Sequence, residues 1–194
     1  GVVSTTDIGC NGATTGAIDI SVSGGTTPYT YAWTSDDPLF SATTQDLSGI
    51  GVGVYAVVIT DDNGCTNSIS GITISQSSSL TAVASATNVN CFGDATGSVS
   101  VSAMGGTPPY SYLWNTGATT TTIDNLISGG SYFVVVTDSV GCSTTSNTVT
   151  ITGPTSPLSA SLVSIQDVFT CFGDNTGFID ISVTGGTQPY SFNW

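Results

Sequence analysis

The chain has 194 residues and a net charge of −13, because its 13 Asp residues face no Lys, Arg or His. Such a chain cannot neutralise phosphates, which excludes nucleic acid and anionic membrane surfaces as partners. The missing residue types exclude Ser-His-Asp, Cys-His and Schiff-base catalysis, so we expect no enzyme activity and no cofactor. No run of 18 apolar residues is present, so no membrane insertion is expected.

Three sequence patterns recur in the same order and define an internal repeat. The first cysteines of successive copies are 81 and then 80 residues apart. This period predicts repeats at 1–77, 78–157 and 158–194, the last one incomplete. We name the patterns the Cys-Gly loop (C-x-G-x-x-T-G at 10–16, 91–97 and 171–177), the Gly-Gly turn (G-G-T-x-P-Y at 24–29, 105–110 and 185–190) and the Asp-Cys turn (T-D-x-x-G-C at 60–65 and 137–142).

Period-2 alternation of apolar and polar residues predicts short strands along each repeat. Six or seven antiparallel strands per repeat predict an all-β fold of tandem immunoglobulin-like β-sandwich modules, each of about 80 residues with one disulfide. One strand, at 55–60 and again at 132–137, is apolar on both faces and is expected in the middle of a sheet. The Trp that closes each aromatic strand is expected in the core. In chain order the predicted strands of the first two repeats are 18–23, the segment ending at Trp33, 55–60, 72–74, 80–89, 98–102, the segment ending at Trp114, 132–137 and 149–151.

The five cysteines are expected to pair within repeats. Cys10 would bond Cys65, and Cys91 would bond Cys142. The partner of Cys171 would lie outside this segment, with a reactive free thiol as the competing interpretation. Paired cysteines indicate an oxidising, extracellular compartment. In the chain-entropy model each such bridge contributes roughly 4 kcal/mol. Short linkers at 76–79 and 153–157 predict a stiff rod of modules.

The Cys-Gly loop, the Gly-Gly turn with its following Trp, and the Asp-Cys turn together resemble the SprB repeat family. That family is named for a giant gliding-motility adhesin of Bacteroidota. The resemblance covers essentially the whole chain. It implies a cell-surface location, export by the type IX secretion system, a role in adhesion or gliding, and further copies outside this segment.

Acidic residues in the turns are weak calcium candidates. Asp61, Asp62 and Asp138 lie in the Asp-Cys turns, but the ligand spacing and distal Glu of an EF-hand are absent. Asp next to Asn and Gly also forms turns, which is the favoured interpretation. Asp94 and Asp174 follow the first cysteine of their repeats, where the first copy has Ala13, so they too are interpreted as turn residues.

A surface glycan is a further candidate modification. Asp138-Ser139-Val140 fits the pattern of O-glycosylation sites in Bacteroidota, which makes Ser139 the candidate residue.

The leading hypothesis is a structural stalk in a long adhesin or filament, whose partners are neighbouring repeats of the same chain or fibre. A second is a carbohydrate-binding module that holds surface polysaccharide through Tyr29, Tyr110 and Tyr190. A third is a fibre subunit whose unfinished third repeat is completed by strands of the next chain.

Overall fold

The computed structural model describes residues 1–167, 173 and 175–194 of the chain. Within these residues every regular element is a β-strand, which confirms the predicted all-β class. Accordingly, a search of the same residues finds no helix that is long and apolar enough to cross a membrane.

The first repeat folds as two three-stranded antiparallel sheets, ordered β1-β2-β4 and β3-β5-β6. This is the division of strands A-B-E and C-F-G in an immunoglobulin sandwich. The topology therefore confirms the predicted immunoglobulin-like fold. Its strands are β1 (Val2–Thr6), β2 (Gly16–Ile20), β3 (Thr30–Ser35), β4 (Leu47–Ile50), β5 (Gly53–Thr60) and β6 (Thr66–Ile74).

The core of this sandwich follows from the period-2 pattern of its strands. In β2, Ile18 and Ile20 are buried while Asp19 between them is exposed. Trp33 on β3 is 1% exposed, and its indole N–H donates to the Thr44 carbonyl at 2.8 Å. Strand β5 lies between β3 and β6, which confirms its predicted central place.

The second repeat uses the same order of strands. Its sheets are β7-β8-β10 and β9-β12-β13, with a two-stranded extension β11-β14. The central β12 is again the strand that is apolar on both faces, and Trp114 is 2% exposed. The strands are β7 (Thr81–Thr87), β8 (Gly97–Met104), β9 (Ser111–Trp114), β10 (Thr122–Leu126), β11 (Ser131–Tyr132), β12 (Val134–Thr137), β13 (Ser143–Thr145) and β14 (Val149–Thr150).

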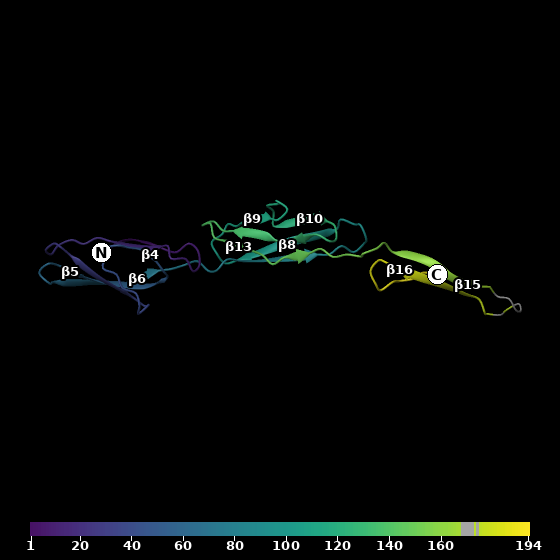
Figure 1. Cartoon of the computed structure of the whole chain (residues 1–194), viewed down its shortest axis with the longest axis horizontal. Coiled ribbons are helices and arrows are strands. Elements are labelled where there is room, and N and C mark those ends of the chain that lie inside the picture. Colours follow the sequence, from purple (N-terminus) through teal and green to yellow (C-terminus); the bar gives the residue numbers. More distant parts are fainter. Residues whose placement is uncertain (168–172, 174) are drawn as a thin grey trace. The chain divides into compact units, whose positions relative to one another are not determined.

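The third repeat is represented by one hairpin, β15 (Ser159–Gln166) paired with β16 (Phe178–Thr184) (Figure 1). Its apolar face is open. Ile179 is 55% exposed, whereas the equivalent Ile18 of the first repeat is 1% exposed. Trp194 is exposed too, so the expectation of a core Trp holds for two of the three copies.

The described chain forms two compact units that do not follow the repeat boundaries. One unit comprises Gly1–Thr81 together with Ala103–Ser111 and Val136–Thr144. It therefore holds the whole first repeat plus the Gly-Gly turn and the Asp-Cys turn of the second. The other unit holds Ala82–Ser102, Tyr112–Val135 and Thr145–Trp194.

Candidate functional site: the bridged junction of two repeats

A disulfide joins the first repeat to the second. Cys10 of the first Cys-Gly loop bonds Cys142 of the second Asp-Cys turn, 132 residues away, with the two Cα atoms 5.5 Å apart. Both cysteines belong to the first compact unit. The predicted pairs Cys10–Cys65 and Cys91–Cys142 are therefore wrong, and Cys65 and Cys91 are exposed free thiols in the described structure. Cys171 lies outside the described residues.

The length of β6 explains why Cys10 and Cys65 do not pair. The Cys-Gly loop is bound to the residues after β6: the Gly12 N–H donates to Oε1 of Gln76 at 2.9 Å. Cys65 instead precedes the first residue of β6. This strand has nine residues, which span about 30 Å at about 3.3 Å per residue. A disulfide requires Cα atoms within about 7 Å, so the two cysteines of one sandwich lie at opposite ends.

The linker between the two repeats runs along the second Gly-Gly turn. The Gly106 N–H donates to the Ser78 carbonyl at 2.8 Å. A Cβ atom built on Gly105 would overlap the Ser79 carbonyl oxygen, and one built on Gly106 would lie 3.2 Å from Cδ1 of Leu80. Only glycine permits this approach of two backbones. The linker is thus held in place by close contact with the backbone of the turn.

Asp138 organises the Asp-Cys turn at this junction. Its side chain is 5% exposed. Oδ2 accepts the Thr107 N–H at 2.9 Å, while Oδ1 accepts the N–H groups of Val140 at 3.1 Å and Cys142 at 2.9 Å. Burial alone would raise the pKa of this carboxyl, but the hydrogen bonds from backbone N–H groups outweigh it and lower the pKa. An ionised Asp138 therefore fixes the turn that presents Cys142.

Two further contacts place the Asp-Cys turn against its neighbours. Ser139 donates both its backbone N–H and its hydroxyl to the Thr107 carbonyl, each at 2.9 Å. Val140 packs on Gly9, where a Cβ atom would lie 3.6 Å from the valine Cβ. Gly9 precedes Cys10, so packing and the disulfide act at the same place. The junction comprises residues 8–12, 75–81, 103–111 and 136–144.

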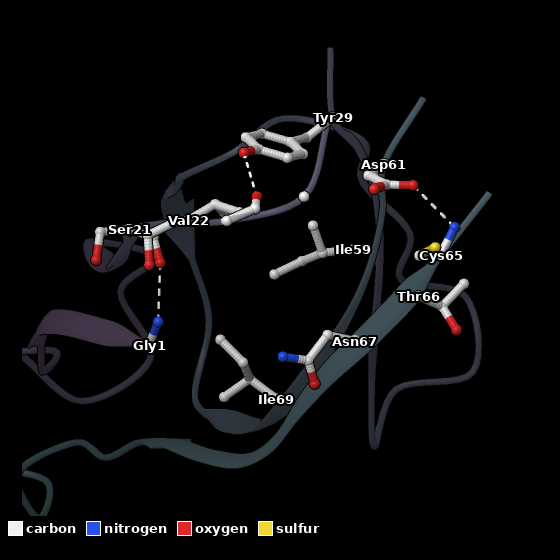
Figure 2. A pocket seen from close by; sticks show the side chains of 13 residues that line it. Gly1, Ser21, Val22, Tyr29, Ile59, Asp61, Cys65, Thr66, Asn67 and Ile69 are labelled. Carbon is white, nitrogen blue, oxygen red and sulfur yellow. Dashed lines mark hydrogen bonds between the residues drawn. The ribbon is translucent and has the colours of Figure 1, made fainter. Parts of the chain in front are cut away.

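The first repeat carries the same turn, and no segment of another repeat covers it in the described part of the chain. Asp61 accepts N–H groups from Thr26 at 3.0 Å, Asn63 at 3.0 Å and Cys65 at 2.8 Å, and its pKa is lowered, chiefly by the Thr26 bond. Beside it opens a cavity of about 400 Å³. Figure 2 shows Ile59 and Ile69 facing this cavity, with Asp61 and Cys65 at its edge.

The calcium candidates serve as turn residues in the structure. Both carboxylate oxygens of Asp61 and of Asp138 accept backbone N–H groups. Asp62 is exposed, and its own N–H donates to the Thr26 carbonyl at 3.0 Å. Asp94 is exposed in the turn after Cys91, and Asp174 lies outside the described residues. Within the described part, no three His, Cys, Asp or Glu side chains are grouped as metal ligands.

The residues considered for carbohydrate binding and for O-glycosylation also take part in turns. In every copy the Tyr hydroxyl of the Gly-Gly turn donates to the carbonyl of the first glycine: Tyr29 to Gly24 at 2.6 Å, Tyr110 to Gly105 at 2.7 Å and Tyr190 to Gly185 at 2.5 Å. Ser139 is exposed, with its hydroxyl on the Thr107 carbonyl. These geometries give the side chains a structural use and do not favour a carbohydrate site.

The chain belongs to the SprB repeat family. The family's sequence profile matches residues 2–38, 83–119 and 163–194, which together exceed half of the chain. Each match begins in or near the first strand of a repeat and includes its Cys-Gly loop and its Gly-Gly turn. The chain is thus a tandem array of repeats of the type found in cell-surface adhesins. A search of curated proteins finds no match.

Several solved structures of multi-domain proteins are similar to the chain at low identity. The three N-terminal domains of the bacteriophage RB49 highly immunogenic outer capsid protein share 15% identity over 95% of this chain and 68% of that one, with a TM-score of 0.47. The amphioxus IgVJ-C2 molecule shares 14% identity over 76% and 98%, with a TM-score of 0.33. Extracellular domains 3–5 of Drosophila OTK share 14% identity over 95% and 75%, with a TM-score of 0.30.

Proposed function

We propose that this chain is a structural stalk segment of a long extracellular adhesin or filament, in which adhesion resides mostly elsewhere. The observation that carries this proposal is the bridge from Cys10 to Cys142, which ties one repeat covalently to the next. The linker held by the Gly-Gly turn supports it, since the Gly106–Ser78 hydrogen bond limits rotation between modules.

The disulfide carries tension past the residues between its two cysteines. Pulled at its ends, the chain transmits force to Cys10 and then through the disulfide to Cys142. The residues between these two cysteines are bypassed, so they neither lengthen nor need to resist unfolding. A thread of ordinary domains would lengthen as each domain unfolded. A surface stalk under shear keeps its length with the bridged arrangement.

Membership of the SprB repeat family supports the finer parts of the proposal. These are display on the cell surface of a bacterium of the Bacteroidota type, export by type IX secretion, and service in gliding or attachment. The disulfide suits an oxidising exterior. The net charge of −13 keeps neighbouring filaments apart by repulsion. O-glycosylation at Ser139 would first require its hydroxyl to leave the Thr107 carbonyl.

Single-molecule stretching of the full chain tests the stalk. The oxidised chain should not extend by the stretch of backbone between its bridged cysteines, which are 132 residues apart, or about 450 Å at about 3.4 Å per residue. Cys10→Ser should release this length, and Cys65→Ser, which alters an exposed free thiol, should not. An oxidised chain that extends as far as Cys10→Ser would refute the proposal.

A second candidate, the fibre subunit completed by strand exchange, is favoured by one observation. The open face of β15 and β16 exposes large apolar side chains, among them Leu162, Ile165 and Ile179. Strands from another chain would cover them. Sedimentation of the chain at rising concentration separates the candidates. Association abolished by Ile179→Ser, but not by Val54→Ser on an exposed face of the first repeat, would favour the fibre.

A further inference from the structure

The disulfide in this chain follows a rule that its free cysteines also satisfy. We propose that Cys65 and Cys91 are each half of a further disulfide to an adjacent SprB repeat, always from the Cys-Gly loop of one repeat to the Asp-Cys turn of the next. Cys65 would bond the Cys-Gly loop of the repeat that precedes it in the array. Cys91 would bond the Asp-Cys turn of the repeat that follows it. This inference rests on the proposed stalk and names the partner of its junctions.

Cys65 is presented as Cys142 is. In both turns an Asp accepts the cysteine N–H, at 2.8 Å for Asp61 to Cys65 and 2.9 Å for Asp138 to Cys142. In both turns the Asp N–H donates to the cysteine carbonyl, at 3.0 Å and 2.9 Å. The backbone of the turn is therefore set before a partner arrives, and Cys65 lacks only the loop that carries the second sulfur.

Among the described residues, none covers the surface around Cys65 as the linker covers its counterpart. Gly24 and Gly25 are exposed, whereas the equivalent Gly105 and Gly106 are half-buried beneath the linker from Ser78 to Leu80. The cavity of about 400 Å³ beside Cys65 is lined by Gly24, Gly25 and Asp61 among others (Figure 2). Because the second repeat has a linker and a Cys-Gly loop at this place, the occupant we assign is the same pair of segments from another SprB repeat.

Cys91 stands at a junction that is already partly built. In the second compact unit the Gly186 N–H donates to the Ser156 carbonyl at 3.1 Å, as Gly106 does to Ser78. The Thr187 hydroxyl donates to the carbonyl of Asn90 at 3.3 Å. Asn90 precedes Cys91, so the third Gly-Gly turn packs next to this cysteine.

In both complete repeats the Asp of the Asp-Cys turn accepts an N–H of the Gly-Gly turn, Thr26 to Asp61 and Thr107 to Asp138. The Asp-Cys turn of a complete following repeat would accordingly arrive beside Cys91.

The new bonds require an oxidant, because each S–S bond forms with the loss of two protons and two electrons from two thiols. A disulfide oxidant takes up both and leaves as two thiols. The resulting loops would interlock, since Cys91 lies within the segment closed by Cys10 and Cys142. A bridge from Cys91 would then start before the previous one has ended, so every stretch of the array would lie within at least one closed loop.

The test for Cys65 extends the full chain by one repeat. A second copy of residues 1–81 is placed before Gly1, which restores the spacing seen between Gly1 and Ala82. The exposed Thr15→Ser in the added copy marks its Cys10 peptide by mass. After oxidation with glutathione disulfide, the thiols are alkylated and the protein is cleaved at Asp, since trypsin finds no Lys or Arg.

We expect the marked Cys10 peptide to be joined to the peptide that starts at Asp62 and holds both Cys65 and Cys91, and we expect Cys65 alone to lose its reactivity with the alkylating agent. Cys10→Ser in the added copy should restore that reactivity, while Cys91→Ser should leave the new bridge intact. A bridge from Cys10 to Cys65 inside one copy, or a Cys65 that stays fully reactive, would overturn the inference. The same digest reports the Cys10–Cys142 bridge, whose absence would instead refute the stalk.

A second extension tests Cys91. Residues 115–157 are added after Trp194, which is equivalent to Trp114. The added Asp-Cys turn should bond Cys91 and withdraw it from alkylation. Gly186→Ala, which presses on Leu158, should slow this bond, and Gly173→Ala, which has open space around it, should not. A Cys91 that remains reactive in the extended chain contradicts the rule.

Discussion

The two Asp-Cys turns of this chain share one set of backbone hydrogen bonds and differ in what lies against them. At Asp138 the carboxylate is buried, and the cysteine of the turn is bonded to Cys10 of the neighbouring repeat. At Asp61 the turn borders an open cavity and Cys65 is a free thiol. The difference separates two contributions. The turn's shape comes from its own sequence, while its cover and its covalent bond come from the preceding repeat.

The disulfide should produce the largest measurable contrast between these turns. Cys10→Ser removes a bridge that spans 132 residues, for which the chain-entropy model gives a loss of about 5 kcal/mol. Cys65→Ser should change the free energy of unfolding by less than about 0.5 kcal/mol, since it alters an exposed free thiol. Urea denaturation under oxidising conditions measures both.

Reducing agent provides the control for this contrast. It should bring the oxidised chain to the stability of Cys10→Ser and leave that variant unchanged. Equal losses for Cys10→Ser and Cys65→Ser would mean that the bridge lies within one repeat after all.

The linker gives the next contrast, through two glycines at the same position of the Gly-Gly turn. Gly24 and Gly105 have φ of 78° and 75°, so alanine at either site costs about 1 kcal/mol in backbone strain. Only at Gly105 does the new Cβ overlap the Ser79 carbonyl, whereas Gly24 has open space. Gly105→Ala should therefore cost about 2–3 kcal/mol, because the linker must move and the Gly106–Ser78 hydrogen bond is lost.

Thermal denaturation measures the stability of Gly105→Ala and Gly24→Ala, and the rate of proteolysis in the linker reports its local mobility. Gly105→Ala should speed cleavage between Ser78 and Thr81, and Gly24→Ala should not. Equal effects of the two substitutions on stability and cleavage would show that the linker does not bear on the turn.

The sandwich itself could be predicted from the sequence because its information is local. Alternation over β2 places Ile18 and Ile20 in the core, and the strand apolar on both faces becomes the central β5. Trp33 and Trp114 are buried as expected. Each of these outcomes depends on a few neighbouring residues within a single repeat.

The cysteine pairing could not be predicted from the same pattern because it depends on where each turn lies in three dimensions. Pairing within repeats treats the two cysteines of a copy as neighbours, yet β6 separates them by its full length. The sequence did carry a usable signal. Cys10 precedes β2, Cys65 lies between β5 and β6, and both adjoin the boundaries of the sandwich rather than its buried strands.

The smallest difference expected between the two turns is in the contribution of their carboxylates, Asp138 and Asp61, to stability. The pH dependence of unfolding measures it. The pKa of Asp138 is lowered in the folded chain, as is that of Asp61, whereas an unfolded Asp has a pKa of about 3.9. Each ionised carboxylate therefore stabilises the fold fully above this value. That stability is lost as pH falls through the lower, folded pKa. Asp138→Asn should thus be destabilising at pH 7, and the penalty should shrink in acid.

Comparison of Asp138→Asn with Asp61→Asn measures how much the neighbouring repeat adds to the stability of the turn. Acid also relieves repulsion among the other carboxylates, but it does so equally in both variants. Asp138 is 5% exposed and Asp61 is only half-buried, so water can replace lost hydrogen bonds more readily at Asp61. The penalty at pH 7 should be larger for Asp138→Asn, and it should fall toward zero below about pH 3.9. Equal penalties at every pH would mean that the neighbouring repeat adds nothing to the turn it covers.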